Sequence, residues 1–242
     1  MAGITVGIFT PNRIGEYGGR ILLVAPEHNW KALIATAVGG FSQLLVLIAF
    51  GLLGLIYYGS HTLNLPVYLL YGFFFVGLLT IGFMLFCFYN IDLLVPIAKR
   101  IPLLQHFKKT LTHLKVLTHY TSKELSTALG ISTLRYFVFS SQYYLMLQFF
   151  GIQLSLLTGL SGVATIYLLQ SGIPLPPLID LLARGELALF IWKPFSEDEI
   201  SILGSTFLVF ILNLIIPSLI GAVFIFKVNI LKSLGYEKES VV

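Results

Sequence analysis

The sequence has few charged residues and a single cysteine. Asp, Glu, Lys and Arg make up 11% of its 242 residues, whereas hydrophobic residues make up 57%. A soluble globular domain has about 25% charged and about 45–50% apolar residues. The composition therefore excludes a soluble enzyme, a nucleic-acid-binding module and a disordered chain. Because Cys87 is alone, no disulfide can form within the chain.

The sequence also lacks the motifs that mark most catalytic centres. It contains no P-loop, no HExxH or GxSxG motif, no dinucleotide fingerprint and no metal-ligand spacing of Cys or His. No polar region is long enough to fold as a separate catalytic domain. We therefore expect a protein that is not an enzyme and that needs no cofactor and no metal.

Long apolar runs dominate what is present. A helix needs about 20 apolar residues to cross a bilayer, and four runs reach that length: Ala32–Tyr58, Val67–Val95, Leu129–Phe150 and Ile200–Phe226. A weaker fifth run, Leu154–Gln170, is rich in Gly, Ser and Thr, which suits a helix packed against other helices. The sequence predicts an all-α, polytopic integral membrane protein with about five transmembrane helices.

A basic segment separates the second span from the third. Residues 97–127 carry six Lys or Arg residues and one acid, Glu124. The positive-inside rule places this segment in the cytoplasm, and its helical spacing of leucines predicts an amphipathic linker on anionic lipid headgroups. Lys227, Lys232 and Lys238 place the C-terminus on the same side. We expect a multi-pass protein of the inner or plasma membrane.

Two charged clusters interrupt the apolar sequence, and both contain proline and glycine. They are TPNRIGEYGGR, residues 10–20, and GIPLPPLIDLLARGE, residues 172–186. Charges within a membrane are paired, hydrated or functional. Proline and glycine end an arriving helix, and a new short helix can begin with its N-terminal amides facing the break, which attracts anions. Two such re-entrant or half-helices in two halves of a chain predict a binding site near the midplane.

The charged side chains of these clusters are predicted to bind a lipid headgroup. The headgroup site is assigned to Arg13, Glu16, Arg20, Arg135, Asp180, Arg184 and Glu186. The helix breaks are assigned to Thr10, Pro11, Gly15, Pro174, Pro176 and Pro177. The arginines would bind phosphate. Glu16 and Glu186 would neutralise them in the empty site or bind a cationic headgroup or a coupling proton, and Asp180 would contribute similarly. Arg135 lies in the third span, where it either snorkels to the interface or faces the interior, with Gln142 and Tyr143 two turns further, and pairs with Glu16, Glu186 or a lipid phosphate.

The two halves of the chain follow the same order of elements. Each has a break, a short charged helix, a polar elbow and a long span, and the elbows are Pro26–Lys31 and Lys193–Glu199. The charge distribution places the elbows on opposite sides of the membrane. This order predicts an inverted repeat, with residues 1–96 and 128–242 as the two repeats of one membrane domain and 97–127 as the linker.

The two breaks resemble the signature motifs of the lysylphosphatidylglycerol synthase transmembrane region family, which is also described as flippase-like. Thr10, Pro11, Gly15 and Glu16 match its first motif, approximately T-P-x-x-x-G-E. The second motif, P-x-P-G-G-x-G-x-x-E, is matched less well, because prolines stand where its glycines are expected. Members that make aminoacylated lipids carry a soluble aminoacyltransferase domain, which this sequence lacks. The resemblance, over essentially the whole chain, implies the translocating or lipid-binding part alone.

The resemblance also bears on the start of the sequence. Full-length members of the family carry further transmembrane helices before the first motif. The apolar run Met1–Phe9 is too short to span a bilayer and leads directly into the first break. We therefore expect a sequence that is shortened at its N-terminus.

Three functions fit these features. The first is a flippase-like translocase of a lipid or polyprenyl phosphate, with membrane lipids as its partners. The second is an accessory subunit that moves nothing and binds a lipid-modifying enzyme, an envelope glycosyltransferase or a second copy of itself; the charged clusters would then be structural pairs. The third is an intramembrane transferase with Glu16 or Glu186 as a general base. A nucleic-acid partner is not expected.

Overall fold

The computed structural model describes residues 2–7, 10, 15–22, 24–25, 28–91, 120–172, 175 and 177–226. Within these ranges the chain is helical and forms no strand. Three helices are long and apolar enough to cross a membrane: α3 (Asn29–His61), α4 (Val67–Tyr89) and the continuous helix Glu199–Ile225. The prediction of an all-α fold with membrane-spanning helices is confirmed to this extent. The predicted linker helix, apart from its last residues, and the basic C-terminus lie outside the described residues.

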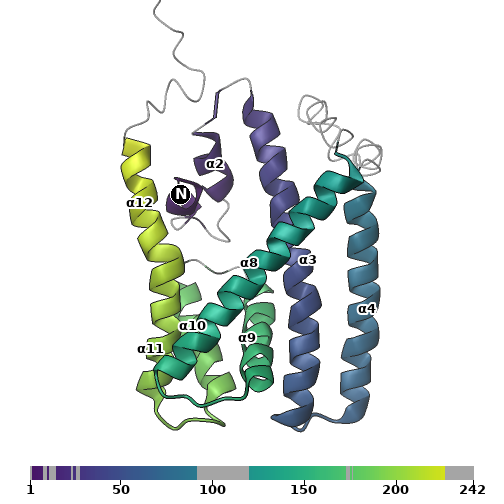
Figure 1. Ribbon diagram of the computed structural model, residues 1–242, viewed down its shortest axis with the longest axis vertical. Helices are drawn as coiled ribbons and strands as arrows, with labels where there is room; N and C mark the ends of the chain where they lie inside the picture. Colours follow the sequence, from purple (N-terminus) through teal and green to yellow (C-terminus); the bar gives the residue numbers. More distant parts are fainter. Residues whose placement is uncertain are drawn as a thin grey trace, which may run out of the picture.

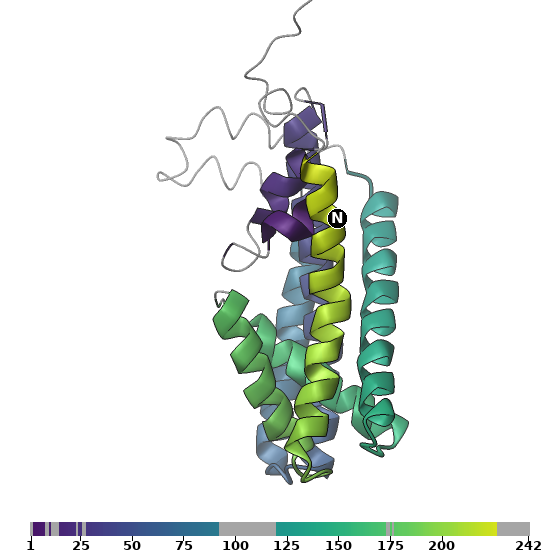
Figure 2. The same ribbon diagram turned by 90° about the vertical axis from the view of Figure 1, so that its left-hand side faces the viewer.

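The remaining helices surround these three. In chain order they are α1 (Ala2–Gly7), α2 (Gly15–Ile21), α8 (Ser122–Phe149), α9 (Leu156–Ser171) and α10 (Pro177–Trp192). The continuous third helix itself consists of α11 (Glu199–Phe210), the π-helix η5 (Ile211–Ile215) and α12 (Ile216–Phe226). Helix α8 crosses the face of the bundle diagonally (Figure 1). In the turned view α8 and α10 lie on opposite sides of the molecule, with α11 and α12 between them (Figure 2).

Two helix pairs form hairpins that reach only part of the way along the bundle. In α1–α2, the backbone of Gly3 approaches Glu16 and that of Gly15 approaches Val6, so the two helices run antiparallel. In α9–α10, Gly162 packs against the ring of Trp192. The first hairpin lies in the upper half of the molecule and the second in the lower half (Figure 1). We call the end of α1 with the start of α2, and the end of α9 with the start of α10, the turn ends of the hairpins. These turn ends face each other near mid-height (Figure 1).

The prediction of five spans is not confirmed, because α9 is too short. Its 16 residues extend about 24 Å at a rise of 1.5 Å per residue, whereas the hydrocarbon core is about 30 Å thick. Helix α8 has 28 residues and is less apolar than the three candidate spans. The second span also ends earlier than predicted, at Tyr89 rather than Val95, and the residues after Ile91 lie outside the described part.

Capping side chains fix where several helices begin. Thr121 and Glu124 form a reciprocal capping box at the start of α8, and Ser155 caps α9 by accepting from the Thr158 N–H. Asp198 caps α11, accepting from the backbone N–H groups of Ile200 and Ser201. The hydroxyl and backbone N–H of Ser201 stabilise the charged carboxylate and hold the pKa of Asp198 below its usual value.

Helices α3 and α9 pack closely because two glycines face the contact. A Cβ atom on Gly51 would lie 2.7 Å from Cβ of Leu168, and one on Gly54 would collide with Ala164. Small residues let helix backbones approach in this way where lipid gives no hydrophobic driving force for association. The contact holds α9 against the second half of α3, with its C-terminal end pointing to mid-height (Figure 1).

The arrangement predicts which ends of the helices share a side of the membrane. The start of α3 and the loop between α10 and α11 lie at opposite ends of the molecule (Figure 1). In a Cys87→Ala background, the Lys31→Cys and Ser196→Cys variants should react with a membrane-impermeant maleimide from opposite sides of sealed vesicles. Labelling of both thiols from the same side would contradict this orientation.

Candidate functional site

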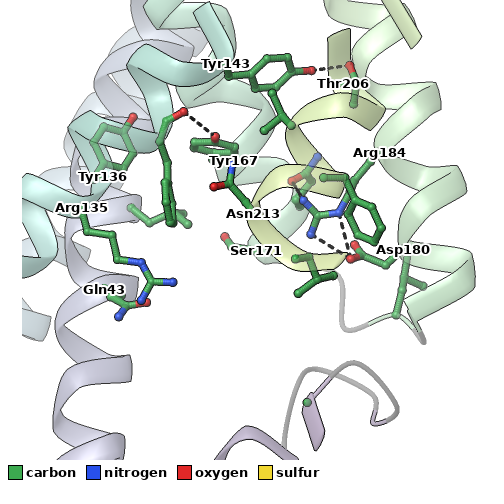
Figure 3. Close-up of a pocket in the computed structure, with 18 of the residues that line it drawn as sticks. Gln43, Arg135, Tyr136, Tyr143, Tyr167, Ser171, Asp180, Arg184, Thr206 and Asn213 are labelled. Carbon is green, nitrogen blue, oxygen red and sulfur yellow. Dashed lines mark hydrogen bonds and ion pairs between the residues drawn. The ribbon is translucent and has the colours of Figure 1, made fainter. Parts of the chain in front are cut away.

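A polar cavity of about 360 Å³ lies where the turn ends of the two hairpins meet. Gly7 and Thr10 reach it from the first hairpin, and the end of α9 and the start of α10 reach it from the second. Helices α3, α8 and α11 and the π-helix η5 complete the wall. Figure 3 shows the side chains that line it. The volume falls within the range of about 300–1,000 Å³ found for small-molecule sites.

Arg184 of α10 is neutralised within its own helix. Its Nε and Nη2 atoms donate to Oδ2 of Asp180, one turn earlier, at 3.0 and 2.9 Å. Its Nη1 atom donates to Oε1 of Gln170 on α9 at 2.9 Å, which ties the two helices of the hairpin together. Both charged side chains are only 22% exposed, so the pair is largely withdrawn from solvent.

Arg135 of α8 has no such partner. Its guanidinium lies 5.0 Å from the centre of the Phe139 ring, and no hydrogen bond or ion pair joins it to another of the described residues. Figure 3 shows it beside Gln43, at the edge of the cavity. Arg135 lines the cavity, but the residue is also exposed, so the interpretation that it faces the interior stays a prediction, as does the one that it snorkels to the interface. The predicted pairing with Glu16 or Glu186 is absent from the ion pairs of the described residues.

A row of buried hydroxyl groups forms the end of the cavity near α11. The Tyr143 hydroxyl lies 2.7 Å from Oγ1 of Thr206, and Nε1 of Trp192 donates to the same tyrosine at 3.4 Å. Tyr167 donates to the backbone carbonyl of Phe139 at 3.3 Å. These bonds satisfy polar groups that would be costly to bury alone, and they fix the positions of α8, α9 and α11 around the cavity.

The π-helix η5 gives the cavity its last polar group. Asn213 lies in this wide turn, and its Nδ2 atom donates to Oε1 of Gln142 on α8 at 2.9 Å. Pro217 follows four residues later and has no N–H to donate back to the Asn213 carbonyl. Single π-turns inside α-helices occur frequently at functional sites. The widened turn directs an amide into an otherwise apolar span.

The structure brings some of the predicted site residues together and separates others. Arg135, Asp180, Arg184 and Thr10 all line the cavity. Glu16 and Arg20 form an ion pair with each other on α2 and do not line it. Their charges still act on Arg135, with opposite signs.

Glu186 is exposed on α10 and does not line the cavity. Asp180, which was expected to contribute alongside the glutamates, is the acid that pairs with Arg184, and Glu186 is not its partner. The reason is helical spacing: a carboxylate four residues before an arginine lies on its face, whereas one two residues after it does not.

Of the residues assigned to the helix breaks, the described ones occupy helix starts. The Oγ1 atom of Thr10 accepts a hydrogen bond of 2.7 Å from the backbone N–H of Gly15, the first residue of α2. A Cβ atom on Gly15 would lie 2.5 Å from the Val6 carbonyl, so only glycine fits there. Pro177 is the first residue of α10, where a missing N–H costs least. Pro11, Arg13, Pro174 and Pro176 lie outside the described residues.

Several polar cavity residues were missed by sequence reasoning. They are Gln43, Ser132, Tyr136, Tyr167, Gln170, Ser171, Thr206 and Asn213. Each lies within a largely apolar run, and helical spacing alone does not say which of them face one another. One available signal was Pro217, which marks a disturbed turn within the last span.

Comparison with known proteins assigns no family to this chain: no family model, no curated protein and no solved structure matches it. The class of protein therefore follows from the fold and the cavity. The apolar helices indicate a membrane-embedded helical protein, and the cavity near mid-height carries arginines. Among the described residues, no group of three or more His, Cys, Asp or Glu is placed to hold a metal ion. Anion binding is the chemistry that this arrangement favours.

A double-mutant cycle tests the pairing of Asp180 with Arg184. Asp180→Asn and Arg184→Gln should each lower the free energy of unfolding by about 1–3 kcal/mol, because each leaves a partly buried partner unpaired. The double variant should cost less than the sum of the two, since neither charge then remains. Reversible unfolding in mixed micelles measures all three. Strictly additive losses would show that the two side chains are not coupled.

Proposed function

We propose that this protein binds the phosphate headgroup of a lipid or polyprenyl phosphate in the cavity and moves it across the membrane. The observation that carries the proposal is Arg135, an arginine on the cavity wall without a hydrogen bond or ion pair to another described residue. Guanidinium groups bind phosphate through short, charge-assisted hydrogen bonds. The site is thus complementary to an anion.

The charges of the described cavity residues support a ligand with a single negative charge. Two arginines and one aspartate line the cavity, and Asp180 already neutralises Arg184. One positive charge, on Arg135, is left. A charged residue near the membrane centre costs about 2.5–3.5 kcal/mol on insertion scales, and a bound phosphate diester would offset that cost. In the empty site the charge of Arg135 is again uncompensated, which favours binding of the next headgroup.

The arrangement of the helices supports movement across the membrane. The hairpin α1–α2 is followed by the spanning helix α3, and the hairpin α9–α10 is followed by the spanning helix α11–α12, which runs in the opposite direction (Figure 1). We propose that these two units form an inverted repeat around the shared cavity. Inverted repeats with discontinuous helices at the midplane are the basis of alternating access in many transporters.

The same features support the resemblance to the lysylphosphatidylglycerol synthase transmembrane region family. Thr10 and Gly15, which match its first motif, together shape the turn end of the first hairpin. We propose membership of that family, residence in the inner or plasma membrane, and a cytoplasmic position for the basic linker and the C-terminus. The linker composition supports that orientation through the positive-inside rule.

The accessory-subunit function is favoured by a different observation, the exposure of α4. Of its 23 residues only Gly77 and Phe88 are buried, so its apolar surface is available to a partner helix, another copy of the chain or lipid. A subunit of this kind would keep its charged pairs for structure and would not need Arg135 uncompensated. The intramembrane transferase is disfavoured, because neither Glu16 nor Glu186 lines the cavity.

Removal of the Arg135 charge should abolish translocation. Proteoliposomes with fluorescent, headgroup-labelled phosphatidylglycerol should exchange lipid between leaflets faster than empty vesicles. Arg135→Gln should reduce the added rate by about tenfold or more, the loss of roughly 1.4 kcal/mol or more of binding or transition-state stabilisation.

Lys193→Gln is the matched control for that experiment, because it removes a positive charge from an exposed ion pair with Glu199 outside the cavity. Its exchange rate should equal that of the wild type. Arg135→Lys should retain part of the activity, since the charge is kept and the bidentate geometry is lost. A folded wild-type protein that exchanges no lipid, or an Arg135→Gln variant with full activity, would favour the accessory function.

A further inference from the structure

A second hollow of about 340 Å³ lies between α3, α4 and the end of α9. Its wall is aliphatic and aromatic, formed mainly by Leu44, Ile48 and Leu52 of α3, Phe73 and Val76 of α4, and Leu168 of α9. None of its lining residues is charged. The hydroxyl of Thr80 donates to the Val76 carbonyl of its own helix at 2.8 Å, so it has no need of a polar ligand. We call this hollow the apolar groove.

The apolar groove adjoins the polar cavity at the end of α9. Ser171, the last residue of that helix, borders both. On α3, Gln43 and Leu47 line the cavity, while their sequence neighbours Leu44 and Ile48 line the groove. The two spaces therefore lie on adjacent faces of α3, at the level where the short hairpin α9–α10 ends. An amphiphile with its polar end in the cavity has an apolar path directly beside it.

The groove lies at the surface of the molecule, because lining residues such as Val76 and Phe73 of α4 are exposed. Its outer wall is α4, whose apolar side chains are mostly exposed; Leu79, for example, is 73% exposed. Along α4 the groove extends from Phe73 to Thr80, about 10 Å at 1.5 Å per residue. That length and the uncharged wall suit a stretch of one hydrocarbon chain lying along the helices.

We propose that the apolar groove holds an acyl chain of the phospholipid whose phosphate is bound by Arg135. This inference rests on the proposed function and assigns the second half of the ligand. Apolar contact with α4 gives little net affinity, because the surrounding lipid is equally apolar. The groove instead fixes the depth and direction of the lipid while the headgroup occupies the cavity. Occupancy of the groove by the acyl chain therefore depends on Arg135 in the adjoining cavity. Ordinary contact between the groove and bilayer lipid would not depend on it.

Photocrosslinking tests that dependence. The probe is phosphatidylglycerol with a diazirine in one acyl chain, present as a small fraction of phosphatidylcholine vesicles that contain the protein. After irradiation, mass spectrometry should locate crosslinks in residues 44–52 and 73–80. These crosslinks should fall several-fold in Arg135→Gln, while crosslinks elsewhere on the exposed face of α4 should not change.

A second pair of variants tests the groove itself. Thr80→Trp fills it, whereas Leu79→Trp places the same ring on the neighbouring exposed position, outside the groove lining. Thr80→Trp should remove the groove crosslinks and slow lipid exchange, and Leu79→Trp should do neither. Melting temperatures in detergent check that both variants are folded; if Thr80→Trp is not, Val76→Phe replaces it.

The outcomes separate this inference from the proposed function. If Arg135→Gln slows lipid exchange but leaves the groove crosslinks unchanged, the groove holds ordinary bilayer lipid: the inference fails and the translocase function stands. If Arg135→Gln leaves lipid exchange at the wild-type rate, the proposed function fails first. Groove crosslinks that persist in Thr80→Trp would also overturn the inference.

Discussion

A guanidinium group held at mid-height in an apolar bundle must be compensated, and this electrostatic constraint governs the cavity. Arg184 meets the constraint internally, through Asp180 and Gln170. Arg135 does not, although it lines the same cavity. The cost of an uncompensated charge in this position is a substantial fraction of the marginal stability of a protein. Under the proposed function, reversible binding of an anion offsets this cost.

The short hairpins make this position accessible. A helix that crossed the whole bundle at α9 or α10 would fill the space now occupied by the cavity. Instead α9 is held against α3 by the close approach at Gly51 and Gly54, and it ends at Ser171, beside the cavity. The first hairpin is attached to α12 by the Thr5 hydroxyl, which donates to the Ser218 carbonyl at 2.7 Å. Each hairpin is thus fixed to a spanning helix, and their turn ends are left to shape the site.

The long elements could be predicted from the sequence because their signal is local. Uninterrupted apolar residues gave α3 and the continuous helix of α11 and α12 within a few residues of their observed bounds. The breaks were visible because proline restricts the backbone and glycine leaves it free, and both disfavour a continuous helix. The short length of α9 could not be predicted from the sequence, because its composition indicates close packing without saying how deep the helix reaches.

The site was predicted less completely, because it depends on contacts between distant residues. The charges in the second cluster were recognisable, and both Asp180 and Glu186 were candidates for the neutralising acid, but only their spacing from Arg184 on the helix distinguishes them. Asn213 and Gln142 are 71 residues apart, and nothing in either neighbourhood marks the pair. The π-turn at Asn213 likewise follows from how the last span packs.

Under the proposed function, the cavity presents an uncompensated positive charge to water-soluble anions. In a Cys87→Ala background, the Ser171→Cys variant places a thiol on the cavity wall, and Gln153→Cys places one in the exposed loop before α9. Their reaction rates with anionic and cationic methanethiosulfonates of similar size measure the local potential. Under the proposed function, the ratio of the anionic to the cationic reaction rate is higher at position 171 than at position 153. Arg135→Gln should abolish this difference between the two positions. Equal preference at both positions, or a preference that survives Arg135→Gln, would contradict it.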